Sequence, residues 1–163
     1  MIAPADSESR ASADDHLSVR LWLRLLACTN LIERRVSADL RARFDTTLPR
    51  FDFLSQLERS PGGLRMSEIS RRMMVTAGNI TRIADGLLAD GLITRKAAPG
   101  DRRASVVRLT AAGRRAFADM ADRHEDWIVD TFAGLSERER TQLHALLAKL
   151  KRHLTARESD PTA

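Results

Sequence analysis

The sequence predicts a mainly α-helical fold with one small β-hairpin. Apolar residues recur three or four positions apart along most of the chain, which is the period of a helix that buries one face. Two runs, 92–98 and 104–110, are β-prone instead, and Pro99-Gly100 between them suit the centre of a type II turn. A chain of 163 residues is long enough for one domain with its own core.

The composition excludes several classes of protein. Hydrophobic residues make up 43% and charged residues 30%, and no apolar run is long enough to span a bilayer. Residues 1–16 and 155–163 are polar and predict a disordered lead and tail, and the lead lacks the features of a signal peptide. The single cysteine, Cys28, cannot form an intramolecular disulfide. Together these features favour a cytoplasmic protein without contact to a membrane.

The positive charge is concentrated in the middle of the chain. Residues 65–115 contain eleven Arg or Lys and four acids, a net charge of +7, whereas the whole chain carries +5. The remaining residues therefore carry −2. A basic block of this kind favours a polyanionic partner.

The first two expected helices precede the basic block. The first covers 19–44, and its early part is apolar on more than one face, which favours burial against a second subunit. The second follows Thr47 and Pro49 and ends before Pro61.

Two short helices separated by a tight turn come next. Ser67 is expected to cap the first of them, and Val75-Thr76 open the second, which Gly91 ends as the residue after the C-cap. After the predicted hairpin, Thr110 is a candidate cap for a helix that continues to Phe132. Ser136 and Glu139 then match a capping box before a leucine-rich last helix.

A helix-turn-helix followed directly by a β-hairpin is a winged helix. This combination suits DNA because the major groove accepts one helix while the hairpin reaches the flanking backbone or minor groove. On the second helix, the face opposite the apolar residues would present a candidate DNA-binding set: Thr76, Ala77, Gly78, Asn79, Thr81 and Arg82. Asn79 suits adenine, Arg82 suits guanine or phosphate, and Gly78 allows close approach of a backbone.

Residues 67–113 resemble the winged helix core of the MarR family of bacterial transcriptional regulators. The segment DRRASVVRLTAAG matches the wing signature of that family, D-x-R followed by a β-run and L-T-x-x-G. The resemblance implies one domain over 17–154, with a DNA-binding lobe at about 46–110 and dimerisation helices at about 17–44 and 111–154. It also implies that Asp101 braces the wing, that Arg103 enters the minor groove and that Arg102 lies near phosphate. Gly78-Asn79 and Gly86 depart from the residues common in the family, so the operator sequence does not carry over.

The resemblance further implies a homodimer that binds a pseudo-palindromic operator in double-stranded DNA. Many such proteins are repressors released by a small aromatic or phenolic acid, and the RMMVTAGN segment favours such an acid or its CoA thioester here. Six residues are candidate effector contacts: Trp22, Arg24, Phe51, Phe53, His124 and Trp127, with Arg34 or Arg35 as further partners for an anion. Aromatic residues at helical spacing are more often core, so a ligand-independent regulator stays open.

Cys28 could serve as an oxidation sensor, but its place on an apolar stripe favours buried packing. The four histidines are scattered, so no metal site or other cofactor is expected. The sequence contains no phosphate-binding glycine loop and no nucleophile elbow, which argues against an enzyme. Besides a ligand-controlled DNA-binding regulator, two alternatives stay open: control through Cys28 or a protein partner, and a helical module that binds another polyanion such as RNA.

Overall fold

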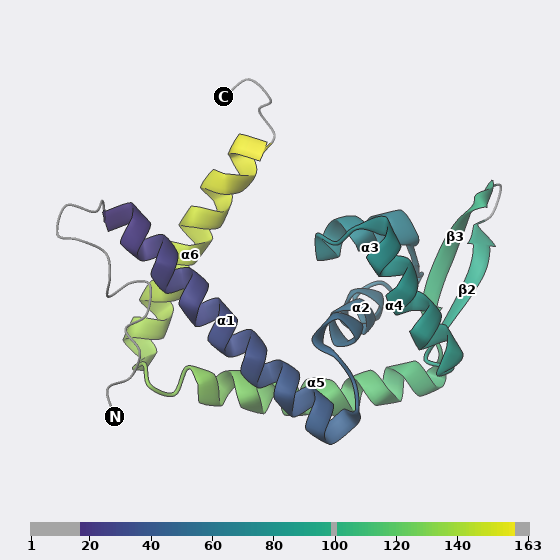
Figure 1. The fold of residues 1–163 in the computed structure, drawn as a ribbon, viewed down its shortest axis with the longest axis horizontal. Helices are drawn as coiled ribbons and strands as arrows, with labels where there is room; N and C mark the ends of the chain where they lie inside the picture. The colour runs from purple at the N-terminus through teal and green to yellow at the C-terminus, as the bar shows by residue number, and fades with distance from the viewer. Residues whose placement is uncertain (1–16, 99–100, 159–163) are drawn as a thin grey trace. The chain divides into compact units, whose positions relative to one another are not determined.

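The computed structural model describes residues 17–98 and 101–158 (Figure 1). Within them the chain forms helices and strands in this order: α1 (Leu17–Phe44), α2 (Leu48–Glu58), β1 (Leu64–Arg65), α3 (Met66–Met73), α4 (Ala77–Ala89), β2 (Ile93–Ala98), β3 (Asp101–Leu109), α5 (Ala111–Thr131) and α6 (Glu137–Glu158). This mostly helical fold with a small antiparallel sheet confirms the predicted fold class. The chain divides into two compact units between His124 and Glu125.

The core of the first unit lies between α2, α3, α4 and the sheet. The buried apolar side chains come from the inner face of each of these elements, from the last turns of α1 and from one residue of the helix α5, namely Val36, Leu40, Phe51, Phe53, Leu54, Leu57, Leu64, Ile69, Ile80, Ile83, Ala84, Leu87, Ile93, Val107, Leu109 and Met120. Their spacing of three or four residues on the helices is the pattern that the sequence shows. Figure 1 shows α3 and α4 beside the hairpin of β2 and β3.

The sheet has three antiparallel strands in the order β1-β3-β2. In the hairpin, Ile93 pairs with Leu109, and the register shifts between Ala97 and Ala98. The Pro99-Gly100 turn predicted at its tip lies outside the described residues.

β1 has no counterpart in the sequence prediction. Its two residues pair with Val106 and Val107 of β3, and such a short strand shows no alternation that would reveal it. Gly63, directly before it, has φ 85°, and a Cβ there would lie 2.6 Å from the carbonyl oxygen of Val107. Glycine is therefore the residue that lets the chain approach β3 this closely.

Short-range capping signals are mostly confirmed. Gly91 follows α4 with φ 69°, and the backbone N–H of Gly113 donates to Oγ1 of Thr110 over 2.9 Å. Ser136 and Glu139 form the expected capping box, in which N–H and Oγ–H of Ser136 donate to Oε2 of Glu139 at 2.8 and 2.6 Å. These bonds lower the pKa of the Glu139 carboxyl group.

The prediction that Ser67 caps the third helix is wrong. α3 begins two residues earlier than a cap at Ser67 would allow, at Met66, and the N-cap position belongs to Arg65, whose side chain makes no capping bond. The reason is β1, because its last residue already has the extended backbone that precedes a helix.

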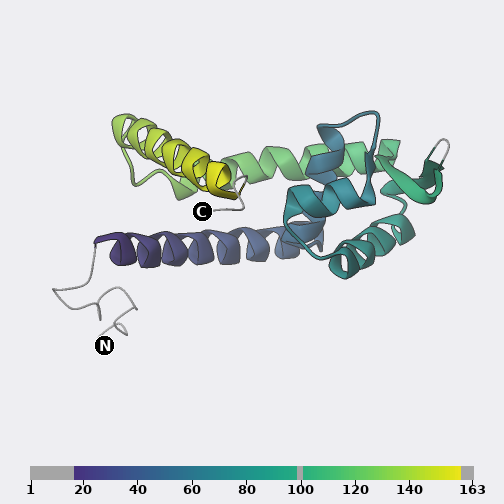
Figure 2. The same cartoon turned by 90° about the horizontal axis from the view of Figure 1, so that it is seen from above.

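α1 is one uninterrupted helix (Figure 2). Its last turns are buried against the core, but its N-terminal part, residues 17–31, leaves large apolar side chains exposed: Leu17, Val19, Leu21, Trp22, Leu26 and Leu31. Cys28 lies in the same part of α1 and is exposed, so the expectation of a buried thiol is wrong for the protomer. The apolar stripe is present as predicted, but within the described protomer only its later part, at Val36 and Leu40, is buried.

The second unit contains the end of α5 and α6. α6 exposes Leu146, Leu147, Leu150 and Leu154, which recur at helical spacing. Neither α6 nor any other helix in the described part of the chain combines the length and apolarity that crossing a membrane requires.

Candidate nucleic-acid interface

The helix α4 has one buried face and one exposed face. Ile80, Ile83 and Leu87 point into the core, and Thr76 starts the helix with an extended backbone whose carbonyl accepts from the N–H of Ile80 over 3.0 Å. The predicted DNA-binding residues lie on the other side: Thr76, Ala77, Gly78, Thr81 and Arg82 are exposed, and Asn79 is half-buried. The structure therefore brings these six residues onto one accessible surface, which we call the α4 surface.

The turn before α4 is held by backbone and side-chain hydrogen bonds. Oγ–H of Ser70 donates to the Val75 carbonyl over 2.6 Å, and the N–H of Val75 donates to the Ser70 carbonyl over 3.2 Å. Met74 between them has φ 54°, and 91% of its surface is exposed. This fixed turn sets the direction in which α4 leaves α3.

Two hydrogen bonds organise the α4 surface itself. Nη2–H of Arg82 donates to Oδ1 of Asn79 over 3.1 Å, and Oγ1–H of Thr81 donates to the Ala77 carbonyl over 2.9 Å. Both pairs follow the three- or four-residue spacing of helix neighbours. The side chains of Asn79 and Arg82 are thus oriented by each other.

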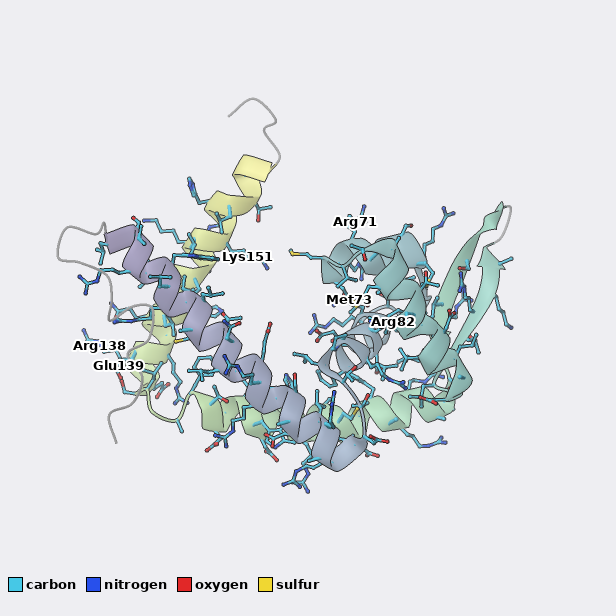
Figure 3. All side chains as sticks on the ribbon, in the orientation of Figure 1. Arg71, Met73, Arg82, Arg138, Glu139 and Lys151 are labelled. Atoms are coloured by element: carbon cyan, nitrogen blue, oxygen red, sulfur yellow. The ribbon has the colours of Figure 1, made fainter. Side chains whose placement is uncertain are left out.

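Carboxylates near the α4 surface pair with arginines other than Arg82. Glu68 accepts from Arg72 over 2.5 Å, and Asp85 lies 3.6 Å from a guanidinium nitrogen of Arg95. Arg71 on α3 and Arg82 on α4 are both exposed (Figure 3). The helix-turn-helix therefore presents positive charge to solvent.

An ion pair that the sequence does not reveal anchors the far end of α4. Arg50 of α2 donates to the carboxylate of Asp90, the C-cap residue of α4, across 40 positions of sequence. Gly86 lies beneath this arginine, since a Cβ there would be 3.3 Å from Nη1 of Arg50. Gly86, which departs from the residues common in the family, thus provides room for Arg50.

The base of the wing is tied to the lobe. Nε–H of Arg108 donates to the Gly62 carbonyl over 2.8 Å, and Oγ1–H of Thr110 donates to the Gly91 carbonyl over 2.8 Å. A Cβ on Gly113 would lie 1.9 Å from the Leu92 carbonyl oxygen, which explains the glycine in L-T-x-x-G. Asp101, Arg102 and Arg103 belong to the backbone of β3, and their side chains lie outside the described residues.

The candidate effector residues of the first unit lie at different depths. Phe53 has no exposed surface and belongs to the core, and Phe51 is almost completely buried, stacked on Phe117 at 5.4 Å. The ring of His124 is 4.7 Å from that of Phe51, and its buried Nδ1 makes no hydrogen bond. Trp22, 59% exposed, and Arg24 lie on the open first half of α1.

His124 and Asp52 influence each other's protonation. Burial lowers the pKa of His124, and the charge of Asp52 acts in the opposite direction. Desolvation raises the pKa of Asp52, His124 opposes this change and Glu33 adds to it. Trp127 belongs to the second unit and is half-buried there. Across residues 17–98 and 101–158, His, Cys, Asp and Glu form no group of three that could hold a metal ion.

Comparison with known proteins gives the same assignment for sequence and fold. Residues 44–104 match the model of the MarR family. An uncharacterized HTH-type transcriptional regulator of Bacillus cereus is 30% identical over 149 residues, which cover 89% of this chain and 96% of that protein.

Solved structures of DNA complexes share the fold. A mutant of MarR from Escherichia coli in complex with operator DNA has a TM-score of 0.74 at 21% identity, covering 83% of this chain and 99% of that one. FabT of Streptococcus pneumoniae in complex with DNA has a TM-score of 0.71 at 25% identity, covering 85% and 98%. With its winged helix, its basic exposed face and these relatives, the chain belongs to the MarR family of DNA-binding transcriptional regulators, which are not enzymes.

Proposed function

We propose that this regulator is a homodimeric repressor that places α4 in the major groove and the wing in the adjacent minor groove. The observation that carries the proposal is the α4 surface, where exposed polar residues lie on a helix whose opposite face is anchored in the core. We assign base and backbone contacts to Thr76, Ala77, Gly78, Asn79, Thr81 and Arg82. Because it acts on DNA, we expect the protein in the cytoplasm.

In the wing, we assign minor-groove binding to Arg103 and a phosphate contact to Arg102, with Asp101 bracing the hairpin. A narrow minor groove has an enhanced negative potential, and a guanidinium group loses its hydration more readily than an ammonium group. The fixed base of the hairpin, where Arg108 bonds to Gly62, supports the idea that the strands carry these residues outward as a stiff unit.

The exposed apolar faces support the homodimer. Leucines at helical spacing on α6 and apolar residues on the first half of α1 would be costly to leave in water. A second copy of the chain would cover them, and its twofold symmetry leads to a pseudo-palindromic operator with half-site centres about 34 Å apart.

For control of DNA binding, we propose release by a small aromatic acid or its CoA thioester. In the first unit, the support is the contact between the tilted rings of Phe51 and His124 with the unbonded Nδ1 of His124, and the exposed Trp22 and Arg24. Phe53 has no surface to offer. A second candidate is redox control through Cys28, which the exposure of this thiol favours.

A gel-shift titration against salt tests the DNA assignment. The wild type should show a steep fall of log K with log[salt], since each neutralised phosphate contributes about −0.9 to the slope. We expect Arg103→Ala to weaken binding to every duplex, and Asn79→Ala to alter the preferred sequence. Arg138→Ala, on exposed α6, is the control for loss of one arginine. Equal affinities for wild type and Arg103→Ala would refute the wing assignment.

A further inference from the structure

The hydrogen bond between Asn79 and Arg82 constrains what the α4 surface can recognise. The Asn79 amide directs its oxygen to Nη2 of Arg82, 3.1 Å away. One of the two lone pairs of that oxygen is then occupied, so the NH2 group is the part of the amide most available to a partner, and a guanidinium group has donors alone. We propose that Asn79 and Arg82 act as one donor-only pair that selects guanine in the operator. This inference rests on the proposed function of α4.

The chemistry of the base edges separates guanine from adenine. An asparagine that binds adenine in two places must accept from N6–H with its oxygen and donate to N7 with its NH2 group. Here the bond from Arg82 already occupies one of the two lone pairs of that oxygen and fixes its direction. Guanine presents two acceptors, O6 and N7, in the major groove, whereas adenine presents a donor at N6. The donors of Asn79 and Arg82 therefore match the two acceptors of guanine. On adenine, one of them would face the N6 donor, with which it cannot form a hydrogen bond.

The surroundings of the pair leave Arg82 directed to Asn79. Asp85, three residues further along α4, is paired with Arg95, and Glu68 on α3 is paired with Arg72. These two carboxylates are therefore engaged elsewhere. Thr81, between Asn79 and Arg82, gives its hydroxyl hydrogen to the Ala77 carbonyl and adds no donor of its own.

Phosphate oxygens are the other acceptors that a donor-only pair could bind. Contacts to phosphate position a protein on DNA but carry no sequence information. Binding to a base and binding to phosphate therefore differ in one observable property: only binding to a base produces a base preference at the contacted base pair. Arg82 also provides the means to separate them, because its removal releases the oxygen of Asn79.

The experiment is a selection of binding duplexes from a randomised pool with the full-length wild type, Asn79→Ala and Arg82→Leu. The base pair of interest is the position of the operator at which the selected duplexes lose their base preference with Asn79→Ala. We expect guanine there with the wild type and a change towards adenine with Arg82→Leu. Replacing that guanine by 7-deazaguanine, which lacks the N7 acceptor, should weaken wild-type binding by about 5- to 100-fold. Arg138→Leu, which removes an exposed arginine of α6 and touches none of the ion pairs around α4, is the matched control and should keep guanine.

Each outcome decides between the alternatives. Adenine with the wild type, or a selected operator with no base preference that depends on Asn79, overturns the donor-only pair while leaving DNA binding intact. Guanine that persists with Arg82→Leu overturns the role of the hydrogen bond. A pool that yields no bound duplex overturns the proposed function itself. Thermal unfolding of each variant verifies folding, and the exposed position of Arg82 favours an unchanged midpoint.

Discussion

The winged helix lobe and the two helical segments that flank it in the sequence differ in how far their leucines are exposed to solvent. In the lobe, α2, α3, α4 and the sheet enclose Leu54, Leu57 and Leu87 almost completely. The first half of α1 and the helix α6 carry leucines at the same helical spacing, yet leave most of them exposed within the protomer. The spacing of the leucines is the same in both regions, and the difference lies in whether other parts of the protomer pack against them.

The comparison separates two sources of stability. Apolar area buried inside the lobe stabilises it at any protein concentration, at about 25 cal/mol per Å². The exposed faces contribute in the same way only when another molecule covers them, so their contribution depends on concentration. Truncations in the lobe should therefore change stability at any protein concentration, whereas truncations on the exposed faces should have effects that depend on concentration.

The largest effect is expected in the lobe. Leu54 is 1% exposed, and Leu54→Ala should lower the free energy of unfolding by about 2–5 kcal/mol because it leaves a cavity in a closed core. Leu88 of the same lobe is 43% exposed, and Leu88→Ala should cost well under half as much. Urea unfolding at two protein concentrations measures both. Equal midpoints for the two variants would show that the lobe is not closed as described.

The next effect concerns α6. Leu147 is 41% exposed, almost as much as Leu88, but it lies among other exposed leucines. A charge placed in a dimer interface must be desolvated, so Leu147→Glu should weaken self-association by at least about tenfold. Sedimentation velocity over a dilution series measures this change. Leu88→Glu is the control of matched exposure and should leave the association constant unchanged; an equal loss in both variants contradicts an interface at α6.

Sequence reasoning succeeds where the determining contact is local. The capping box of Ser136 and Glu139 spans three residues, and Gly91 ends α4 through its own backbone angle, so both signals lie within one turn of helix. The exposed face of α4 is likewise fixed by the period of its apolar residues. The assignment to the family follows from the same segment, because the wing signature and the helix-turn-helix are contiguous.

Sequence reasoning fails where the determining contact is remote. Arg50 and Asp90 are 40 positions apart, and no periodicity links an arginine in α2 to the end of α4. β1 is defined by pairing with β3. Because β1 ends at Arg65, the N-cap of α3 lies at Arg65 and not at the predicted Ser67. For Cys28, the apolar stripe is present as predicted, but the pattern of a stripe does not say whether the same protomer or another molecule buries it.

A smaller effect tests why α4 contains glycine on its exposed face. A Cβ on Gly78 would meet nothing within 4 Å, so the fold itself does not require glycine there. Gly78→Ala should therefore stabilise the protein by about 0.5–1 kcal/mol while lowering affinity for DNA, because the added methyl group occupies space that a bound backbone needs. Gly86→Ala is the control, since Arg50 lies 3.3 Å from its Cβ position and should cancel part of the gain. Thermal unfolding and a gel shift measure the two quantities, and unchanged affinity for Gly78→Ala would remove Gly78 from the interface.

The smallest effect lies at His124, where the closed core ends. Its pKa is lowered, mainly by burial, so the unfolded chain binds the proton more tightly than the folded one. Stability should thus fall as the pH drops through the ordinary value of 6.5, from about 7.5 to about 5.5. Asp52 has the opposite sign, since its raised pKa favours the folded state on protonation, but its ordinary value of 3.8 places that change at lower pH.

His124→Phe keeps an aromatic ring against Phe51 and removes the titrating group. Between about pH 7.5 and about pH 5.5, we expect the Tm of this variant to decrease less than that of the wild type. Above about pH 7.5, the two proteins should show the same dependence of Tm on pH. Asp52→Asn separates the contribution of Asp52, because it removes the charge that favours protonated His124. The Tm of this variant should decrease more steeply with falling pH than the Tm of the wild type. Parallel Tm profiles for all three proteins would show that the unbonded Nδ1 of His124 carries no energetic consequence at the edge of the core.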